Sequence, residues 1–421
     1  MNRTRMRRYE VVVSIWLLTI PNLAWAQVDQ QRADTYFTEA AALCEREGGR
    51  LWGVSLCGPM VFADAATRSL AANRPTPTGP RPPQLGFVQA PIEWAGTRWA
   101  AYVWAMVPTD DPQARGRLMI HELFHRVQPE LGLMTLGKVN GHLDTLEGRY
   151  WTQLEWRALA RTLGASESDR PVAVREALAF RSARRALFEG AAENERADEI
   201  REGLAQYTGT VVSTSSRAEA IADAVRQLAD AQKAPTFVRT FGYASGAAYG
   251  ILLDGWSPGW TRRLRPTDDL GQLVADAARI QPLTGGVEAL AARFGGAELM
   301  AREEARDAEQ KLRIAGLRRR FVEGPVLLVA RGRGAVVNTT GVTPIPEGTV
   351  YFEYRVTAEW GTLASTGVLE SRDGVTLRLP APFRSDGATL VGDGWTVTLA
   401  PGWVVEPGSR SGDFQVVRKG G

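Results

Sequence analysis

Two of the three histidines of this 421-residue chain lie four positions apart, in the segment HELFH that begins at His121. If the segment is helical, His121 and His125 share one face, and both imidazoles can reach one metal ion at about 2.0 Å. Glu122 lies about 100° further round the helix. There it can accept a proton from a water molecule on the ion without binding the ion itself. This pattern predicts a catalytic zinc site, and the alternative is an amphipathic helix with two surface histidines.

The residues around this motif predict a helix. Asp110 or Asp111 can cap its first turn, Pro112 suits its first position, and Pro129 ends it. The apolar neighbours of the motif would keep water away and strengthen the electrostatic interactions inside the site. These neighbours are Leu118, Met119, Leu123 and Phe124.

A catalytic zinc ion needs a third protein ligand and leaves its fourth position to water. The extended motif HExxHxxGxxH is excluded, because Leu131 stands where its last histidine belongs. The remaining histidine, His142, is a candidate for orienting substrate or donating a proton, although a loop histidine often has no such role. Several carboxylates follow the motif and stay open as ligands: Glu147, Glu155, Glu195, Glu199 and Glu202. The last three repeat at helical spacing and predict one acidic helix face, which is ordinarily solvated.

Three segments in this order resemble a known group of enzymes. HELFH followed by EGLAQY looks like the gluzincin metallopeptidases, particularly aminopeptidase N and its relatives. The segment YASGAAYGILL, which begins at Tyr243, is similar to the Y-E-K-G segment of that group. The resemblance implies that Glu202 is the third zinc ligand and that Tyr243 donates a hydrogen bond to the oxyanion. It covers roughly residues 97 to 256, and the chain has no G-A-M-E-N segment of the kind that binds a substrate's free amine.

The expected function is therefore that of a zinc-dependent hydrolase acting on a peptide or protein, with Glu122 as the general base and Zn²⁺ as the cofactor. Two alternatives stay open. One is an exported binding or scaffold protein with a zincin-like fold, and the other is a zinc hydrolase that cleaves a non-peptide bond.

The N-terminus predicts export from the cytoplasm. A basic head, MNRTRMRRYE, precedes the apolar run VVVSIWLLTI and the cleavage pattern AWA, so residues 1–26 are expected to be a signal peptide. An uncleaved anchor is the alternative. No later run is long and apolar enough to span a bilayer, so the expected location is the periplasm or the extracellular medium. Cys44 and Cys57, 13 positions apart, are either a disulfide or two buried thiols.

The chain is expected to fold as an α+β protein with several domains. After the signal peptide, residues 27–115 form an α/β part with a helix at 30–47 and strands at 51–64 and 97–107. The strand at 97–107 is either a sheet edge that binds an extended peptide or an interior strand. Residues 116–322 form a helical catalytic part, and residues 323–421 form a β-sandwich-like module that offers a surface to an envelope partner. The predicted helices span residues 112–128, 146–163, 167–189, 191–211, 217–232, 242–254 and 296–321.

The charge of the chain is nearly balanced. Lysine and arginine number 50 against 47 aspartates and glutamates, which gives a net charge of +3. No dense basic stripe with interleaved aromatic residues follows the signal segment, so nucleic acid is not expected as a partner.

Overall fold

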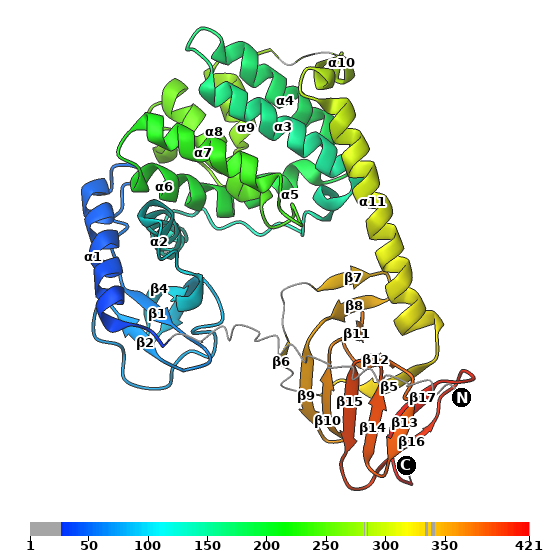
Figure 1. Cartoon of the computed structure of the whole chain (residues 1–421). Helices are drawn as coiled ribbons and strands as arrows, with labels where there is room; N and C mark the ends of the chain where they lie inside the picture. The colour runs from blue at the N-terminus through cyan, green and yellow to red at the C-terminus, as the bar shows by residue number, and fades with distance from the viewer. Residues whose placement is uncertain (1–26, 282, 284, 333–335, 338–341, 421) are drawn as a thin grey trace, which may run out of the picture. The chain divides into compact units, whose positions relative to one another are not determined.

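The computed structural model describes residues 27–281, 283, 285–332, 336–337 and 342–420. It confirms the α+β class, with a small mixed sheet near the N-terminus, a helical region and a C-terminal all-β region (Figure 1). The chain divides into two compact units, one ending at Leu299 and the other starting at Met300. The predicted signal peptide, residues 1–26, lies outside the described residues. Within the described part, no helix combines the length and apolarity that a membrane span requires.

The mixed sheet follows helix α1 (Gln30–Glu47) and has the strand order β2-β1-β4-β3. Strands β1 and β4 are parallel, and the other two pairs are antiparallel. Its strands are β1 (Met60–Ala63), β2 (Leu70–Ala72), β3 (Ala90–Trp94) and β4 (Thr97–Val103).

The bounds predicted for two strands of this region were wrong. The strand predicted at 51–64 starts only at Met60, because the preceding residues form turns in which Gly53 takes a φ of 83°. The prediction for 97–107 left the sheet position open, and the structure makes β4 an interior strand that ends at Val103. The two edge strands are β2 and β3, and the sequence analysis missed both.

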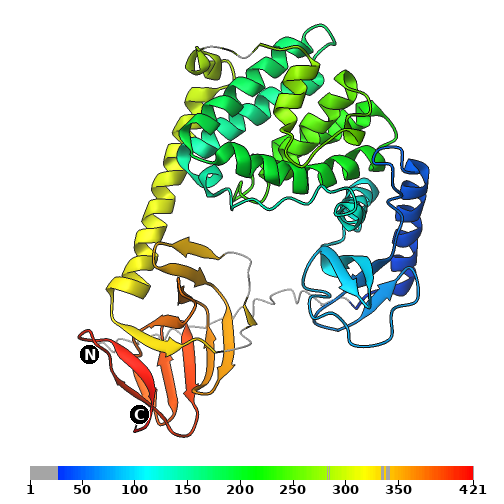
Figure 2. The same cartoon turned by 180° about the vertical axis from the view of Figure 1, so that it is seen from behind.

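The first unit continues as a layered set of helices (Figures 1 and 2). The predicted helix at 191–211 is interrupted, because a π-helical turn, η3, separates α5 from α6. The sequence analysis missed α9 and α10. The elements are α2 (Pro112–Val127), η2 (Gly141–Asp144), α3 (Leu146–Gly164), α4 (Arg170–Leu187), α5 (Ala191–Asp198), η3 (Glu199–Gly203), α6 (Leu204–Ser213), α7 (Arg217–Ala231), α8 (Phe241–Trp256), η4 (Trp260–Arg262), α9 (Leu270–Ala277) and α10 (Val287–Ala292).

Helix α2, which carries the HELFH motif, lies between the mixed sheet and the helices and packs against both β4 and α6 (Figure 1). Asp111 caps it by accepting a hydrogen bond from the backbone N–H of Ala114 at 2.9 Å. On the sheet side, the hydroxyl of Tyr102 donates to the carbonyl of Met119 at 2.8 Å. Since both flanks of α2 are packed, the face that carries the motif is fixed in position.

A disulfide joins Cys44, at the end of α1, to Cys57 in the loop before β1. The sequence analysis left this pairing open. A disulfide of this kind is consistent with an oxidising compartment outside the cytoplasm.

The second unit begins within helix α11 (Gly296–Arg318), which is followed by the π-helical turn η5 (Arg319–Glu323) and two mainly antiparallel sheets. Side chains from both sheets, including Leu327, Tyr354, Trp360 and Trp395, form one core, as expected for a sandwich. One sheet has the order β16-β17-β5-β12-β11-β8-β7 and the other β13-β14-β15-β10-β9-β6.

The strands of the second unit differ at one point from the expected pattern. The segment TVYFEYRVT reads as one strand but forms two, which belong to different sheets, because Glu353 turns the chain with a φ of 99°. The strands are β5 (Val326–Ala330), β6 (Val336–Val337), β7 (Thr343–Ile345), β8 (Gly348–Tyr351), β9 (Tyr354–Ala358), β10 (Gly361–Ser365), β11 (Val368–Ser371), β12 (Thr376–Pro380), β13 (Arg384–Asp386), β14 (Thr389–Gly392), β15 (Trp395–Leu399), β16 (Trp403–Pro407) and β17 (Phe414–Arg418).

Candidate metal centre

Three predicted ligands from distant parts of the first unit meet at one point. His121 and His125 project from α2, and Glu202 projects from the π-helical turn η3. The Nε2 atoms of the two histidines are 3.0 Å apart. Oε2 of Glu202 lies 3.5 Å from Nε2 of His121 and 3.2 Å from Nε2 of His125.

These spacings fit a tetrahedral metal ion. Donors that bind zinc at about 2.0–2.1 Å with tetrahedral angles lie about 3.3 Å from one another. The three observed distances, 3.0, 3.2 and 3.5 Å, scatter around that value. Two imidazoles and one carboxylate with the fourth position open to water are the donor set of a hydrolytic zinc site. The residues therefore fit a divalent cation, and their geometry alone leaves its identity open.

The hydrogen bond on the far side of His125 fixes which of its nitrogens carries the proton. Nδ1 of His125 lies 2.8 Å from Oε1 of Gln128. The amide nitrogen of Gln128 donates to the carbonyls of Ile200 and Arg201 at 2.9 and 3.1 Å, so the amide oxygen must face the histidine. Because an amide oxygen only accepts, Nδ1 is the donor, and neutral His125 turns the lone pair of Nε2 towards Glu202.

His121 has the same arrangement. Its Nδ1 lies 3.1 Å from Oε1 of Gln206, so its Nε2 also presents a lone pair to the group. Two lone pairs and a carboxylate oxygen therefore converge, and such an arrangement needs a cation between them. Burial of the ring lowers the pKa of His125, but the carboxylates of Glu202 and Glu122 raise it above its ordinary value, so this position favours a positive charge, supplied by a proton or by a metal ion.

Glycines place Glu202 and Tyr243 side by side. A β-carbon at Gly203 would lie 2.8 Å from the α-carbon of Gly246, and one at Gly246 would lie 2.3 Å from the α-carbon of Gly203. Helix α8 can therefore approach η3 closely only because neither position has a side chain. The approach stacks the ring of Tyr243 on that of His121, with centroids 5.2 Å apart and planes at 7°.

The carboxylate of Glu202 is oriented from its other side. Arg201 donates to Oε1 at 3.1 Å, which leaves Oε2 for the histidines. Burial acts to raise the pKa of Glu202, but its contacts with His121 and His125 hold that pKa well below the usual range. Glu202 is therefore ionised at neutral pH, as a metal ligand must be.

Glu122 and Tyr243 complete the group without joining its three donors. Glu122 is 4% exposed, and its Oε2 has no hydrogen-bond partner among the described residues. Burial and the nearby carboxylate of Glu202 raise the pKa of the Tyr243 hydroxyl, so it stays protonated and can donate. Both residues line the same cavity of about 240 Å³ as the three donors, next to Gln89 and Pro91 at the start of β3.

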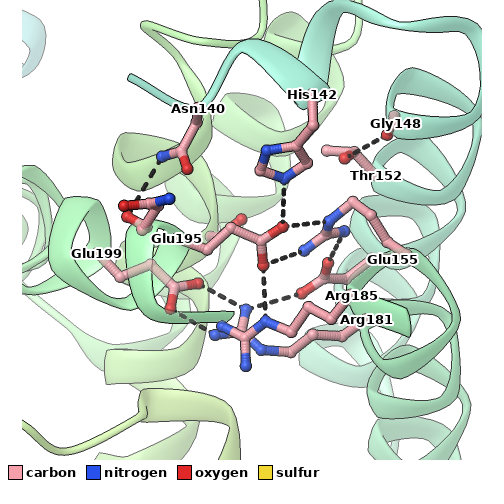
Figure 3. A network of polar contacts seen from close by, with 12 residues as sticks. Asn140, His142, Gly148, Thr152, Glu155, Arg181, Arg185, Glu195 and Glu199 are labelled. Carbon is pink, nitrogen blue, oxygen red and sulfur yellow. Dashed lines mark hydrogen bonds and ion pairs between the residues drawn. The ribbon is translucent and has the colours of Figure 1, made fainter. Parts of the chain in front are cut away.

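The π-helical turn explains why the expected acidic face does not form. Spacing placed Glu195, Glu199 and Glu202 on one face, but the wider turn at η3 rotates Glu202 away from the other two. Glu195 and Glu199 are fully buried and contact arginines instead. Arg184 donates to Glu195 at 2.7 Å. Arg181 donates to Glu199 at 2.6 Å (Figure 3).

His142 does not join the metal group. Its Nε2 lies 2.9 Å from Oε1 of Glu195 (Figure 3). Its ring packs near Phe188. Glu155, another ligand candidate, is fully buried and binds Arg184 and the hydroxyl of Tyr249. Both residues thus belong to a buried ionic cluster.

The sequence analysis missed the residues that orient the ligands: Gln128, Gln206 and Arg201. A signal for two of them was present. Gln128 follows His125 by three positions and Gln206 follows Glu202 by four, which are the separations at which helical side chains are neighbours. Since the second nitrogen of a metal-binding histidine ordinarily has a hydrogen-bond partner, Gln128 and Gln206 could have been proposed for this role.

Comparison of the chain with protein-family profiles, curated proteins and solved structures finds no match. Membership in the gluzincin peptidases therefore stays a prediction, supported by the motifs and by the geometry of His121, His125 and Glu202.

Proposed function

We propose that this protein is an exported zinc-dependent hydrolase whose substrate is a peptide or protein. The observation that carries the proposal is the convergence of two histidine lone pairs and one carboxylate oxygen at about tetrahedral spacing, with the unpaired carboxylate of Glu122 beside them. Zinc bound there would activate a water molecule and polarise a carbonyl group.

The residues around the ion each have a role in this reaction. Glu122 accepts the proton of the attacking water and passes it to the leaving amine. Tyr243 donates a hydrogen bond to the oxygen on which negative charge develops. Gln128 and Gln206 hold the histidines in the tautomer that binds metal.

One edge strand supports a peptide as the substrate. Strand β3 pairs with β4 on one side and has no strand on its other side within the described residues. Gln89, Ala90 and Pro91, at its start, line the cavity with the metal group. An extended peptide can pair with such an edge and present its backbone carbonyl to the ion. The disulfide Cys44–Cys57 supports export to an oxidising compartment.

Replacement of Glu122 by glutamine tests the function. The variant should still bind zinc, because Glu122 is no ligand, and should lose hydrolysis of a mixed peptide library by about 10²- to 10⁴-fold. Glu147, an exposed glutamate, supplies the control, and Glu147→Gln should cleave like the wild type. If the zinc-loaded wild type cleaves no peptide in the library, or if Glu122→Gln is fully active, the proposal is wrong.

A further inference from the structure

The amide that contacts His121 is the first member of a chain of hydrogen bonds. The amide nitrogen of Gln206 donates to Oε1 of Gln227 at 2.7 Å. The amide nitrogen of Gln227 donates in turn to Oδ2 of Asp223 at 2.9 Å. Gln227 and Asp223 lie one turn apart on α7, and Asp223 is 1% exposed. This series of hydrogen bonds connects His121 to the buried carboxylate of Asp223 through two intervening side chains, Gln206 and Gln227.

The carboxylate gives this chain a direction. Ionised Asp223 can only accept, so Gln227 must turn its NH₂ group towards it and its oxygen towards Gln206. Gln206 then turns its own NH₂ towards Gln227 and its oxygen towards His121. Only Nδ1 of His121 can donate to that oxygen, so Nε2 is left with a lone pair for the metal.

Two arginines donate hydrogen bonds to the carboxylate of Asp223. Arg117 donates to Oδ2, and Arg226 donates to Oδ1. Arg117 lies on α2, one turn before His121. The chain therefore starts and ends on the helix that carries the histidines, and it passes through α6 and α7 on the way.

We propose that Asp223 and Gln227 are positioning residues that set the tautomer of His121 through Gln206 and thereby raise the metal affinity of the site. This inference rests on the proposed metal centre and not on the hydrolytic reaction. An amide between two partners can exchange its oxygen and its NH₂ group at little cost. Here the series of hydrogen bonds ends in a carboxylate, which accepts hydrogen bonds and donates none, so one arrangement of both amides is favoured. The buried charge of Asp223 thus acts on a ligand that it does not touch.

The test is Asp223→Asn, with zinc affinity measured by competition with a chromogenic chelator. Asparagine has one acceptor atom where Asp223 has two, so it cannot accept from Arg117, Arg226 and Gln227 as the carboxylate does. Where its NH₂ group replaces Oδ2 and displaces Arg117, both amides reverse and His121 carries its proton on Nε2. We expect zinc to bind about 10- to 100-fold more weakly, the range found when second partners of metal-binding histidines are removed.

A second substitution separates positioning from simple structural damage. In the Asp223→Asn background, Gln206→Glu places beside His121 a carboxylate that accepts the Nδ1 proton whichever way Gln227 turns. We expect this double variant to bind zinc with wild-type affinity. An effect of lost packing or lost charge at position 223 would persist, so failure of the rescue overturns the proposal, as does wild-type affinity of Asp223→Asn alone.

Asp254→Asn is the matched control, because Asp254 accepts hydrogen bonds from Tyr207 and Trp260 and takes no part in the chain. It should leave zinc affinity unchanged. If Asp223→Asn does not fold, Gln227→Met breaks the chain while keeping the charge of Asp223, and the same loss and the same rescue by Gln206→Glu are expected. Absence of zinc binding by the wild type would instead refute the metal centre itself.

Discussion

Glu195, Glu199 and Glu202 follow one another on α5 and η3, but they belong to two groups of acidic side chains that differ in what neutralises them. Glu155, Glu195, Glu199 and Asp269 face the guanidinium groups of Arg181, Arg184 and Arg185. Figure 3 shows Glu155, Glu195 and Glu199 around Arg181 and Arg185. Glu202 and Glu122 face two histidine lone pairs, and the nearest guanidinium, that of Arg201, binds only the outer oxygen of Glu202. Three guanidinium groups face the four carboxyls of the first group, and burial raises the pKa of Glu199 to about 7 although Arg181 lowers it, so the charges of this group nearly balance. The second group requires a cation. The difference separates a structural ionic cluster from a metal centre.

The largest effect is expected from the arginine cluster. Arg184→Ala removes the guanidinium that binds Glu155 and Glu195, both fully buried. Removal of one partner of a buried ion pair costs about 3–5 kcal/mol, because the remaining charge has no water to solvate it. Urea unfolding should show this loss in free energy, and added zinc should not restore the interaction.

Lys233→Ala is the control for that experiment. Lys233 pairs with Asp230 at 2.8 Å on the surface, with both side chains more than 70% exposed. Its loss should cost at most about 1 kcal/mol. If the two variants lose similar amounts, the arginine cluster is not the stabilising element described here.

A somewhat smaller effect is expected at the metal centre from Tyr243→Phe. Removal of one hydrogen-bond donor to a developing oxyanion lowers kcat by about 10²- to 10³-fold, or 2.7–4 kcal/mol in the barrier. The ring still stacks on His121, so zinc affinity should not change. Tyr207→Phe is the matched control, because the hydroxyl of Tyr207 binds Asp254, away from the cavity of the metal group. An unchanged kcat for Tyr243→Phe would remove this tyrosine from the mechanism.

The smallest effect is a dependence of stability on acid pH. Burial acts to raise the pKa values of Glu195 and Asp269, but the arginines beside them hold both values below the usual range. A carboxyl whose pKa is lowered in the folded state stabilises the protein at pH values above its ordinary pKa, which is 4.5 for Glu195. That stabilisation is lost as the pH falls below this value.

The unfolding free energy of the first unit, followed by circular dichroism in urea, should therefore fall as the pH drops below about 4.5. From about pH 7 to 5 it should instead rise as the pH falls, because burial raises the folded-state pKa of Glu199 to about 7 and this carboxyl takes up its proton in the folded state first. The fall should persist in His125→Ala, which disables the metal centre and leaves the arginine cluster intact. A free energy that stays level down to about pH 3 would contradict ionised Glu195 and Asp269.

The part of the site that depends on local spacing could be predicted from the sequence. His121, Glu122 and His125 lie within two turns of one capped helix, so their mutual geometry follows from the helix itself. Glu202 and Tyr243 came from resemblance, because their positions depend on the close packing of Gly203 on Gly246, which no local pattern specifies. The role of His142 was missed for the same reason, since its partner Glu195 is far along the chain.

The fold was predictable to a similar degree. Long helices with clear periodicity, such as residues 30–47 and 112–128, were predicted nearly to their ends. The π-helical turn at Glu199–Gly203 was not, because its sequence continues the helical pattern on both sides. The split at Glu353 was missed because alternation continues across a turn that a positive φ allows.

The central claim is that His121, His125 and Glu202 together hold one cation, and a zinc titration tests it most directly. Calorimetry on metal-free protein at about pH 7 should give one zinc ion per chain, and free zinc at 1,000 times Kd should stabilise the fold by about 4.1 kcal/mol. Glu202→Gln and His125→Ala should abolish both results, whereas Glu147→Gln should not. A wild type that binds no zinc, or variants that bind it as the wild type does, would contradict the claim.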